Sequence, residues 1–95
     1  MPIYAVTYLY TDDTEAKDRI RPEHRAFLAS LLDEGVLLAS GPYVDADGGA
    51  LLILQGEGTA EEVLSRLDAD PFRREGLIAE RSIRPWDVVI GGFAS

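Results

Sequence analysis

The sequence predicts an α+β fold with the element order β-α-β-β-α-β, the ferredoxin-like arrangement in which two helices cover one face of an antiparallel sheet. Three observations predict it. Apolar runs of strand length alternate with segments of helical periodicity. Turn-forming residues separate the second and third runs, which is typical of a hairpin. The chain has 95 residues, 46% of them hydrophobic, and no cysteine, so we expect residues 1–95 to form a single domain without disulfides.

Composition and end signals mark the first strand and the first helix. Residues Ile3–Tyr10 are rich in β-branched and aromatic side chains and precede a polar stretch, which is typical of a strand. Leu28 and Leu31 belong to an apolar series at helical spacing. Proline is favoured in the first turn of a helix and glycine just after the last turn. We therefore expect the first helix to begin at Pro22 and to end at Gly35.

Turn and capping residues mark the middle of the chain. Val36–Ser40 and Ala50–Leu54 are apolar runs, and the turn-forming residues Asp45–Gly49 lie between them. This pattern predicts a hairpin. Thr59 and Glu62 have the spacing of a capping box, in which each side chain accepts a hydrogen bond from the backbone of the other residue. We therefore expect the second helix to begin just after Thr59.

The last part of the chain contains a short helical turn and an extended segment. Asp70 and Pro71 suit an N-cap followed by proline at the first helical position, and we expect the turn that they begin to end near Gly76. Leu77–Ile83 has the composition of the final strand. Asp87–Ile90 is expected to form a further short strand.

Both faces of the predicted sheet are apolar, because alternate side chains of a strand point to opposite sides. One side of the first strand carries Ile3, Ala5 and Leu9, and the other carries Tyr4, Val6, Tyr8 and Tyr10. In the third strand Leu51 and Ile53 oppose Leu52 and Leu54. Two helices can cover only one of these faces. The other face would be larger than the apolar patches that soluble monomers expose.

We expect a second copy of the chain to cover this face, which predicts a homodimer through the sheet face. We expect the pairing of the two sheets to enclose a hollow, and the candidate site described below to lie in that hollow. An alternative is a monomer whose C-terminal tail, from Trp86 through Ile90, folds over the same face.

The charge balance limits the possible partners. The chain has 17 acidic and 9 basic residues and a net charge of −8. Non-specific binding to nucleic acid or to an anionic membrane surface needs a surplus of basic residues. No apolar run approaches the ~20 residues that cross a bilayer, and the first residues lack the pattern of a signal peptide. We expect a cytoplasmic protein that binds neither nucleic acid nor membrane.

His24 is the only histidine of the chain, and it shares the inward stripe of Leu28 and Leu31 in the first turn of the expected helix. Imidazole titrates near neutral pH, so a partly buried histidine beside a cavity is a candidate acid or base. A structural hydrogen bond at the helix start is the alternative interpretation. Asp70 is explained by capping alone. Ser40-Gly41-Pro42 could offer a hydroxyl and backbone amides to a ligand, or could simply end its strand.

Several kinds of chemistry are excluded by the absence of their motifs. The sequence contains neither of the glycine-rich nucleotide-binding fingerprints, G-x-x-x-x-G-K-[ST] and G-x-G-x-x-G. One histidine and no cysteine exclude a metal site made of nitrogen or thiolate ligands within one chain. No nucleophile elbow is present. We therefore expect any chemistry to proceed without a bound cofactor or metal.

An ordered set of landmarks runs over nearly the whole chain: Arg21-Pro22-Glu23-His24, Leu31 to Gly35, Ser40-Gly41-Pro42, Asp70-Pro71-Phe72, Gly76-Leu77 and Pro85-Trp86. In this order they resemble the YciI-like (YCII-related) family of small bacterial proteins. The resemblance implies a dimeric α+β barrel, in which two sheets pack face to face. It also implies a His–Asp pair in a cleft, here His24 and Asp70.

The resemblance adds the segment Ser40-Gly41-Pro42 to the lining of that cleft, and we assign Tyr8 of the first strand to substrate binding with it. The family includes an enzyme that eliminates chloride from a chlorinated hydroxyquinol. We expect a cofactor-independent lyase or isomerase that acts on a small cyclic or phenolic molecule, with His24 as the base and Asp70 orienting it. The alternative is a non-catalytic module that binds a small molecule or a partner in the same cleft. A third hypothesis makes His24 an axial haem ligand, because related folds include haem proteins.

Overall fold

The sheet has four antiparallel strands in the order β2-β3-β1-β4. The structure, a computed structural model, describes residues 1–45 and 48–93. The elements in chain order are β1 (Ile3–Tyr10), α1 (Thr14–Asp33), β2 (Leu37–Pro42), β3 (Ala50–Gln55), α2 (Ala60–Leu64), a 3₁₀ turn (Ser65–Leu67), α3 (Pro71–Arg74) and β4 (Ile78–Pro85). This confirms the predicted α+β class and the ferredoxin-like element order.

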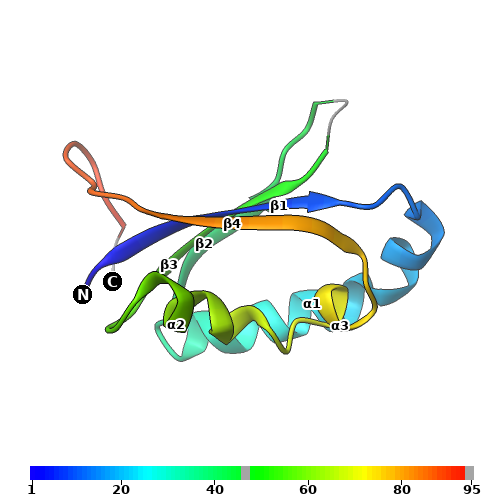
Figure 1. The fold of residues 1–95 in the computed structure, drawn as a ribbon, viewed down its shortest axis with the longest axis horizontal. Helices are drawn as coiled ribbons and strands as arrows, with labels where there is room; N and C mark the ends of the chain where they lie inside the picture. The colour runs from blue at the N-terminus through cyan, green and yellow to red at the C-terminus, as the bar shows by residue number, and fades with distance from the viewer. Residues whose placement is uncertain (46–47, 94–95) are drawn as a thin grey trace.

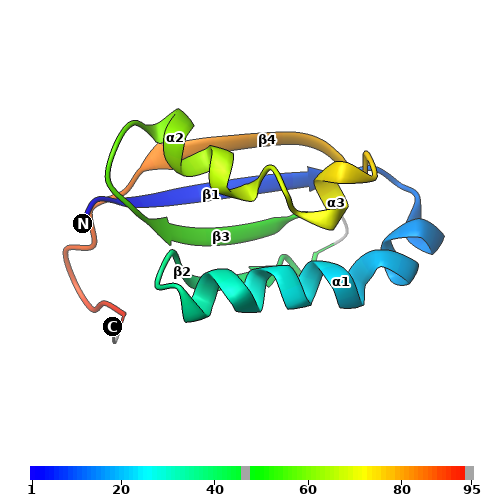
Figure 2. The ribbon, with the colours of Figure 1, turned by 90° about the horizontal axis from the view of Figure 1, so that it is seen from below.

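All three of these α-helices lie on one side of the sheet, with the long helix α1 running below β2 and β3 in the view of Figure 1. Seen from below in Figure 2, α2 and α3 lie beside α1, over β1 and β4. The opposite face of the sheet carries no helix among the described residues. None of the described helices combines the length and the apolar character needed to cross a membrane.

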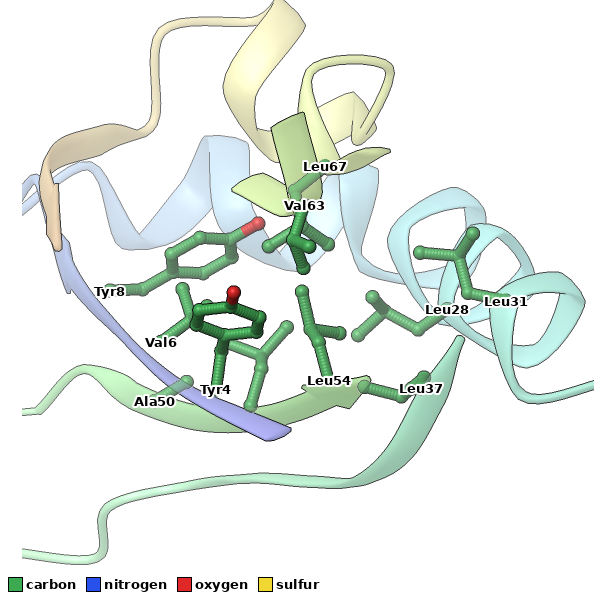
Figure 3. Packing of buried hydrophobic residues seen from close by; sticks show 11 residues of the cluster. Tyr4, Val6, Tyr8, Leu28, Leu31, Leu37, Ala50, Leu54, Val63 and Leu67 are labelled. Carbon is green, nitrogen blue, oxygen red and sulfur yellow. The ribbon is translucent and has the colours of Figure 1, made fainter. Parts of the chain in front are cut away.

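The main core lies between the sheet and the helices (Figure 3). Side chains from β1 and β3 point toward α1, α2 and the 3₁₀ turn, which contribute apolar side chains of their own. The buried cluster consists of Tyr4, Val6, Tyr8, Leu28, Leu31, Leu37, Ala50, Leu52, Leu54, Val63 and Leu67. Val6, Tyr8, Leu52, Leu54 and Leu67 are 0% exposed, so the centre of this core is closed to water.

Helix α1 begins at Thr14, and the expected start at Pro22 is wrong. The side chain of Asp13 caps the helix by accepting a hydrogen bond from the amide of Ala16 at 3.1 Å. Glu15 adds a negative charge to the first turn, where the partial positive charge of a helix lies. These acidic residues are the true start signal. Pro22 lies inside the helix, where its ring removes one intrahelical hydrogen bond.

Packing explains why α1 tolerates this proline. Ala16 and Ile20, which precede it, are buried in a second apolar cluster with Phe72 and Leu77. The burial of these side chains offsets the hydrogen bond lost at Pro22. Local propensity alone would have ended the helix there, and tertiary contacts extend it toward β1.

The capping box of the second helix is confirmed. The Thr59 side chain accepts from the Glu62 amide at 3.2 Å, and the Thr59 amide donates to the Glu62 carboxylate at 3.4 Å. Helix α2 begins at the next residue, Ala60. The predicted hairpin is also present as β2 and β3, while Ala46 and Asp47 of its turn lie outside the described residues.

Gly49 allows the end of this hairpin to approach β1 closely. Its φ of +90° lies in the left-handed region that favours glycine. A Cβ atom at this position would lie 2.5 Å from the carbonyl oxygen of Tyr8, which is closer than non-bonded atoms can approach. Any side chain here would therefore push the hairpin away from β1.

The predicted strand at Asp87–Ile90 is wrong. Strand β4 ends at Pro85, and the residues that follow have no strand structure. In Figure 1 this tail leaves the sheet at the end where the chain begins. Val89 and Ile90 are 81% and 93% exposed, so the tail does not bury its apolar side chains over the open face of the sheet. The alternative of a monomer sealed by its own tail is therefore wrong as well.

The open face of the sheet is apolar along its two central strands and polar along β4. Ile3, Ala5 and Leu9 of β1 lie on this face beside Leu51 and Ile53 of β3. Cross-strand pairing places three polar residues of β4 on the same face: Glu80 opposite Leu9, Ser82 opposite Thr7, and Arg84 opposite Ala5. The apolar area is therefore a stripe with a charged edge.

Candidate active site

The structure brings the side chains of His24 and Asp70 together. His24 lies near the middle of α1 and not in its first turn, on a buried stripe that also contains Ala16, Ile20, Leu28 and Leu31. Its Nδ1 atom is 2.7 Å from Oδ1 of Asp70. Asp70 is 0% exposed and His24 is 8% exposed. The pair is therefore buried between α1 and the start of α3.

Asp70 accepts hydrogen bonds from three donors. Its side chain caps α3 through the amide of Phe72, which donates to Oδ1 at 3.0 Å. The hydroxyl of Tyr8 donates to Oδ2 at 3.0 Å. An ionised carboxylate is acceptor-only, so Nδ1 of His24 is the third donor. Capping thus orients the Asp70 carboxylate, and the same carboxylate then orients the imidazole.

This arrangement fixes the histidine tautomer. A neutral imidazole that carries its proton on Nδ1 has an unprotonated Nε2, which can accept a proton. The ring stacks on Phe72 with centroids 4.0 Å apart and an angle of 6° between the planes. Within the described residues Nε2 has no hydrogen-bond partner, and it is not among the buried polar atoms sealed from solvent. The basic nitrogen is thus held in one orientation and remains accessible.

Two tyrosines near Asp70 remain protonated well into the alkaline range. Burial raises the pKa of the Tyr8 hydroxyl far above its ordinary value, and the charge and hydrogen bond of Asp70 raise it further. Burial and the same carboxylate raise the pKa of Tyr10 to about 12. Tyr8 is therefore a permanent donor to Asp70 at physiological pH.

A cavity of about 360 Å³ lies beside the imidazole. His24 and Phe72 form one wall, and Ser40, Gly41 and Pro42 of β2 form another. The predicted segment and the predicted base thus share one cavity. Its volume is within the range typical of small-molecule sites.

Two of the predicted site residues lie behind the cavity and not on its wall. Asp70 and Tyr8 are both 0% exposed. Neither side chain lines the cavity. The structure therefore places Tyr8 in contact with Asp70, where it positions the carboxylate, and away from the substrate-binding wall that we expected it to form.

The expectation that two paired sheets enclose the hollow is wrong. Ala50 and Leu52, which line the cavity, pair with Tyr8 and Val6 on the helix-covered face of the sheet. The cavity therefore lies between α1 and the sheet of a single chain. The prediction failed because it placed His24 at a helix end, whereas the longer α1 carries the imidazole underneath the hairpin.

Sequence reasoning missed two arginines that line the cavity, Arg21 and Arg25. With His24 and Leu28 they stand at positions i, i+3, i+4 and i+7 of α1, which form one face of a helix. This spacing was visible in the sequence. The spacing does not indicate a site in the sequence alone, because a helix that begins at Pro22 leaves Arg21 outside it.

The described residues contain no group of three or more histidine, aspartate or glutamate side chains that could hold a metal ion. His24 is the one imidazole of the chain, and its Nδ1 is bonded to Asp70. The site thus combines an imidazole, a carboxylate bonded to it, and polar groups around a small cavity.

The fold and the buried imidazole–carboxylate pair define a class, the small α+β ferredoxin-like proteins that carry a candidate acid–base pair beside a cavity. A family model described as the YCII-related domain matches residues 1–87. The chain belongs to this YCII-related family, as the landmarks in the sequence indicated. Protein YciI of Escherichia coli O6:H1 is 32% identical over 87 residues, which cover 82% of this chain and 88% of the relative. Protein YciI of Shigella flexneri matches with the same figures.

Solved structures share the fold. 5-Chloro-2-hydroxyhydroquinone dehydrochlorinase (TftG) from Burkholderia phenoliruptrix AC1100, in complex with 2,5-dihydroxybenzoquinone, has a TM-score of 0.75 and 22% identity, covering 90% of this chain and 93% of its own. An antibiotic biosynthesis monooxygenase has a TM-score of 0.57 and 18% identity, covering 94% and 99%. At these identities the likeness shows the fold alone, and it supports the predicted fold class.

Proposed function

We propose that this protein is an enzyme that processes a small cyclic or phenolic molecule without a bound cofactor, with His24 as the general base. The observation that carries the proposal is the 2.7 Å contact between Nδ1 of His24 and Asp70, which leaves Nε2 free beside the cavity. A base of this kind typically contributes about 10²–10⁴-fold to the rate of a proton transfer.

The proposed reaction begins with proton transfer to Nε2 from a carbon or hydroxyl group of the substrate. The imidazolium formed in this step is stabilised by the Asp70 carboxylate, because an opposite charge at hydrogen-bond distance favours the charged form of the ring. The electron pair left on the substrate either expels a leaving group as an anion or takes up a proton at another carbon. The first outcome is an elimination and the second an isomerisation, and neither requires an oxidant or reductant.

The structural neighbour TftG supports the elimination branch. It is a dehydrochlorinase, and its ligand 2,5-dihydroxybenzoquinone is a small planar ring. Chlorinated hydroxyquinols are therefore the first substrates to assay with this protein, followed by small lactones for the isomerisation branch.

The test compares the wild type with His24→Gln, which keeps a polar side chain but has no basic nitrogen. We expect turnover to fall by at least about 100-fold while a ligand still raises the melting temperature. Arg19→Gln is a matched control, because Arg19 is an exposed residue of α1 that does not line the cavity. Unchanged turnover in His24→Gln would contradict the assignment.

The second candidate is a non-catalytic module that binds a small molecule in the same cavity. It is favoured by the capping role of Asp70, which gives that residue a structural function without any reaction. Ligands that raise the melting temperature of the wild type but are never turned over would favour this candidate over the enzyme.

We also propose that two copies pair through the open face of the sheet. The proposal is supported by the apolar stripe of β1 and β3, in which Leu9 remains 44% exposed in the single chain. Sedimentation equilibrium should give a dimer for the wild type and a monomer for Leu9→Lys. Leu32→Lys is the control, since Leu32 is 54% exposed on α1, away from the stripe. A monomeric wild type would refute the pairing.

A further inference from the structure

We propose that the cavity selects small planar oxyanions, carboxylates or phenolates, and that Arg25 receives the anionic group. The inference rests on the proposed use of this cavity for a small molecule and specifies the charge of that molecule. It follows from where the chain places its cations and its carboxylates.

Helix α1 presents two guanidinium groups to the cavity. Arg21 and Arg25 are one turn apart on the same face of α1, with His24 between them, and all three line the cavity. Guanidinium groups bind carboxylate and phenolate oxygens through charge-assisted hydrogen bonds. Arg21 is already paired with Asp18, so Arg25 is the guanidinium that remains to receive an anion.

Arg25 has no carboxylate partner among the described residues. Most other arginines have one: Arg21 with Asp18, Arg66 with Glu34, Arg73 and Arg81 with Asp68, and Arg74 with Glu23 and Glu75. The chain has 17 acidic residues, yet none of the described ones lines the cavity. Among the described residues that line the cavity, the side chains with a permanent charge are those of Arg21 and Arg25.

The other walls of the cavity suit a flat apolar ring. Leu28 of α1 and Leu52 of β3 line it together with Phe72, which stacks on His24. The hydroxyl of Ser40 is available on the opposite wall. A ring lying along these apolar side chains would direct one substituent toward Arg25 and another toward Nε2 of His24.

The test measures binding of two matched pairs by NMR, with nitrogen-15-labelled protein and detection of the arginine Nε–H and backbone amide signals. Benzoate and benzamide form the carboxylate pair, and 2,4-dinitrophenolate and 2,4-dinitroanisole form the phenolate pair. We expect each anion to bind roughly tenfold more tightly than its neutral partner, because hydrogen bonds to charged groups are stronger than those between neutral groups. The two pairs show which oxyanion the cavity prefers.

Arg25→Gln should reduce the ratio of the two affinities within each pair, anion over neutral compound, to near one. Arg19→Gln removes the same charge from the same helix outside the cavity, and it should leave this ratio of affinities unchanged. Equal affinity for anions and neutral compounds, or equal ratios in the two variants, would overturn the inference. Failure of all four compounds to shift signals from residues that line the cavity would overturn it as well. The His24→Gln turnover assay is independent of these ratios, so the proposed function can survive either result.

Discussion

Replacing Tyr8 by phenylalanine removes one donor from the buried network around Asp70 and changes little else. The Tyr8 ring is 0% exposed and its hydroxyl lies 3.0 Å from Oδ2 of Asp70. Phenylalanine fills nearly the same volume, so no large cavity forms. A hydrogen bond to a charged group contributes about 1.5–3 kcal/mol to stability. We therefore expect Tyr8→Phe to lower the free energy of unfolding by about 2 kcal/mol at pH 7.

This loss should shrink at alkaline pH. The pKa of Tyr8 is raised in the folded protein by burial and by Asp70. Below pH ~10 the phenol is protonated in both states, and above it the unfolded chain loses the proton while the folded protein keeps it. The folded state then binds more protons, so stability falls as pH rises. At pH 11 this costs the wild type about 1.4 kcal/mol, a cost that Tyr8→Phe does not have.

Urea unfolding of both proteins at pH 7, 9, 10 and 11 measures the effect. The difference in unfolding free energy should fall from about 2 kcal/mol at pH 7 to below about 1 kcal/mol at pH 11. Tyr10, whose pKa is raised to about 12, is present in both proteins and cancels from the difference. A difference that stays constant from pH 7 to pH 11 would show that Tyr8 ionises equally in both states, which would refute its burial against Asp70.

Three further predictions concern the scaffold of the site. Asp70→Asn should retain the cap of α3 and unfold at a melting temperature above that of Asp70→Ala, since asparagine also caps helices, with about 1 kcal/mol between the two variants in urea unfolding. Gly49→Ala should destabilise the protein by at least about 1 kcal/mol more than Gly48→Ala. Both glycines have a positive φ, but only a Cβ atom at Gly49 would strike the carbonyl oxygen of Tyr8. Similar urea midpoints for the two variants would contradict this. Leu67→Ala should cost about 2–5 kcal/mol in the same assay, because Leu67 is 0% exposed and a cavity would remain; a loss below about 1 kcal/mol would show that the 3₁₀ turn collapses into the space.

Most of the fold could be predicted because local signals and tertiary packing agree. The Thr59 capping box and the Asp70–Pro71 helix start are satisfied within a few residues of the chain, so the sequence shows them directly. The start of α1 has two competing local signals, the cap at Asp13 and the proline at Pro22. Tertiary packing decides between them, because the burial of Ile20 in one cluster with Phe72 stabilises the turn that precedes Pro22.

The misplaced start of α1 explains why Arg21 was missed in the site, because it left Arg21 outside the expected helix. His24 and Asp70 were found because one is the only histidine of the chain and because the family resemblance paired them. Arg25 lay inside the expected helix, three residues before Leu28, but it has no such mark, and only the structure shows that it lines a cavity. An arginine on a helix is common in any protein, so its place on a cavity wall is recognised only after the helix and its packing are known.

The cost of burying the His24–Asp70 pair supports the proposed chemical role. Asp70 is needed to cap α3, but a cap does not require a histidine beside it. The stripe of α1 that contains His24 is otherwise apolar, with Ile20 before it and Leu28 after it, and burying an imidazole and a carboxylate costs more than burying apolar side chains of similar volume. A leucine at position 24 would fill the space but would not donate to Asp70, so the buried carboxylate would lose one of its three hydrogen-bond donors. Nor would it supply an unprotonated nitrogen at the wall of a cavity that two arginines also line. We therefore expect His24→Leu to have a lower free energy of unfolding in urea than the wild type under either role, and turnover by the folded variant separates the two. A folded His24→Leu protein that binds ligand but is inert supports the chemical role, and one that keeps its turnover shows that the role of His24 is structural.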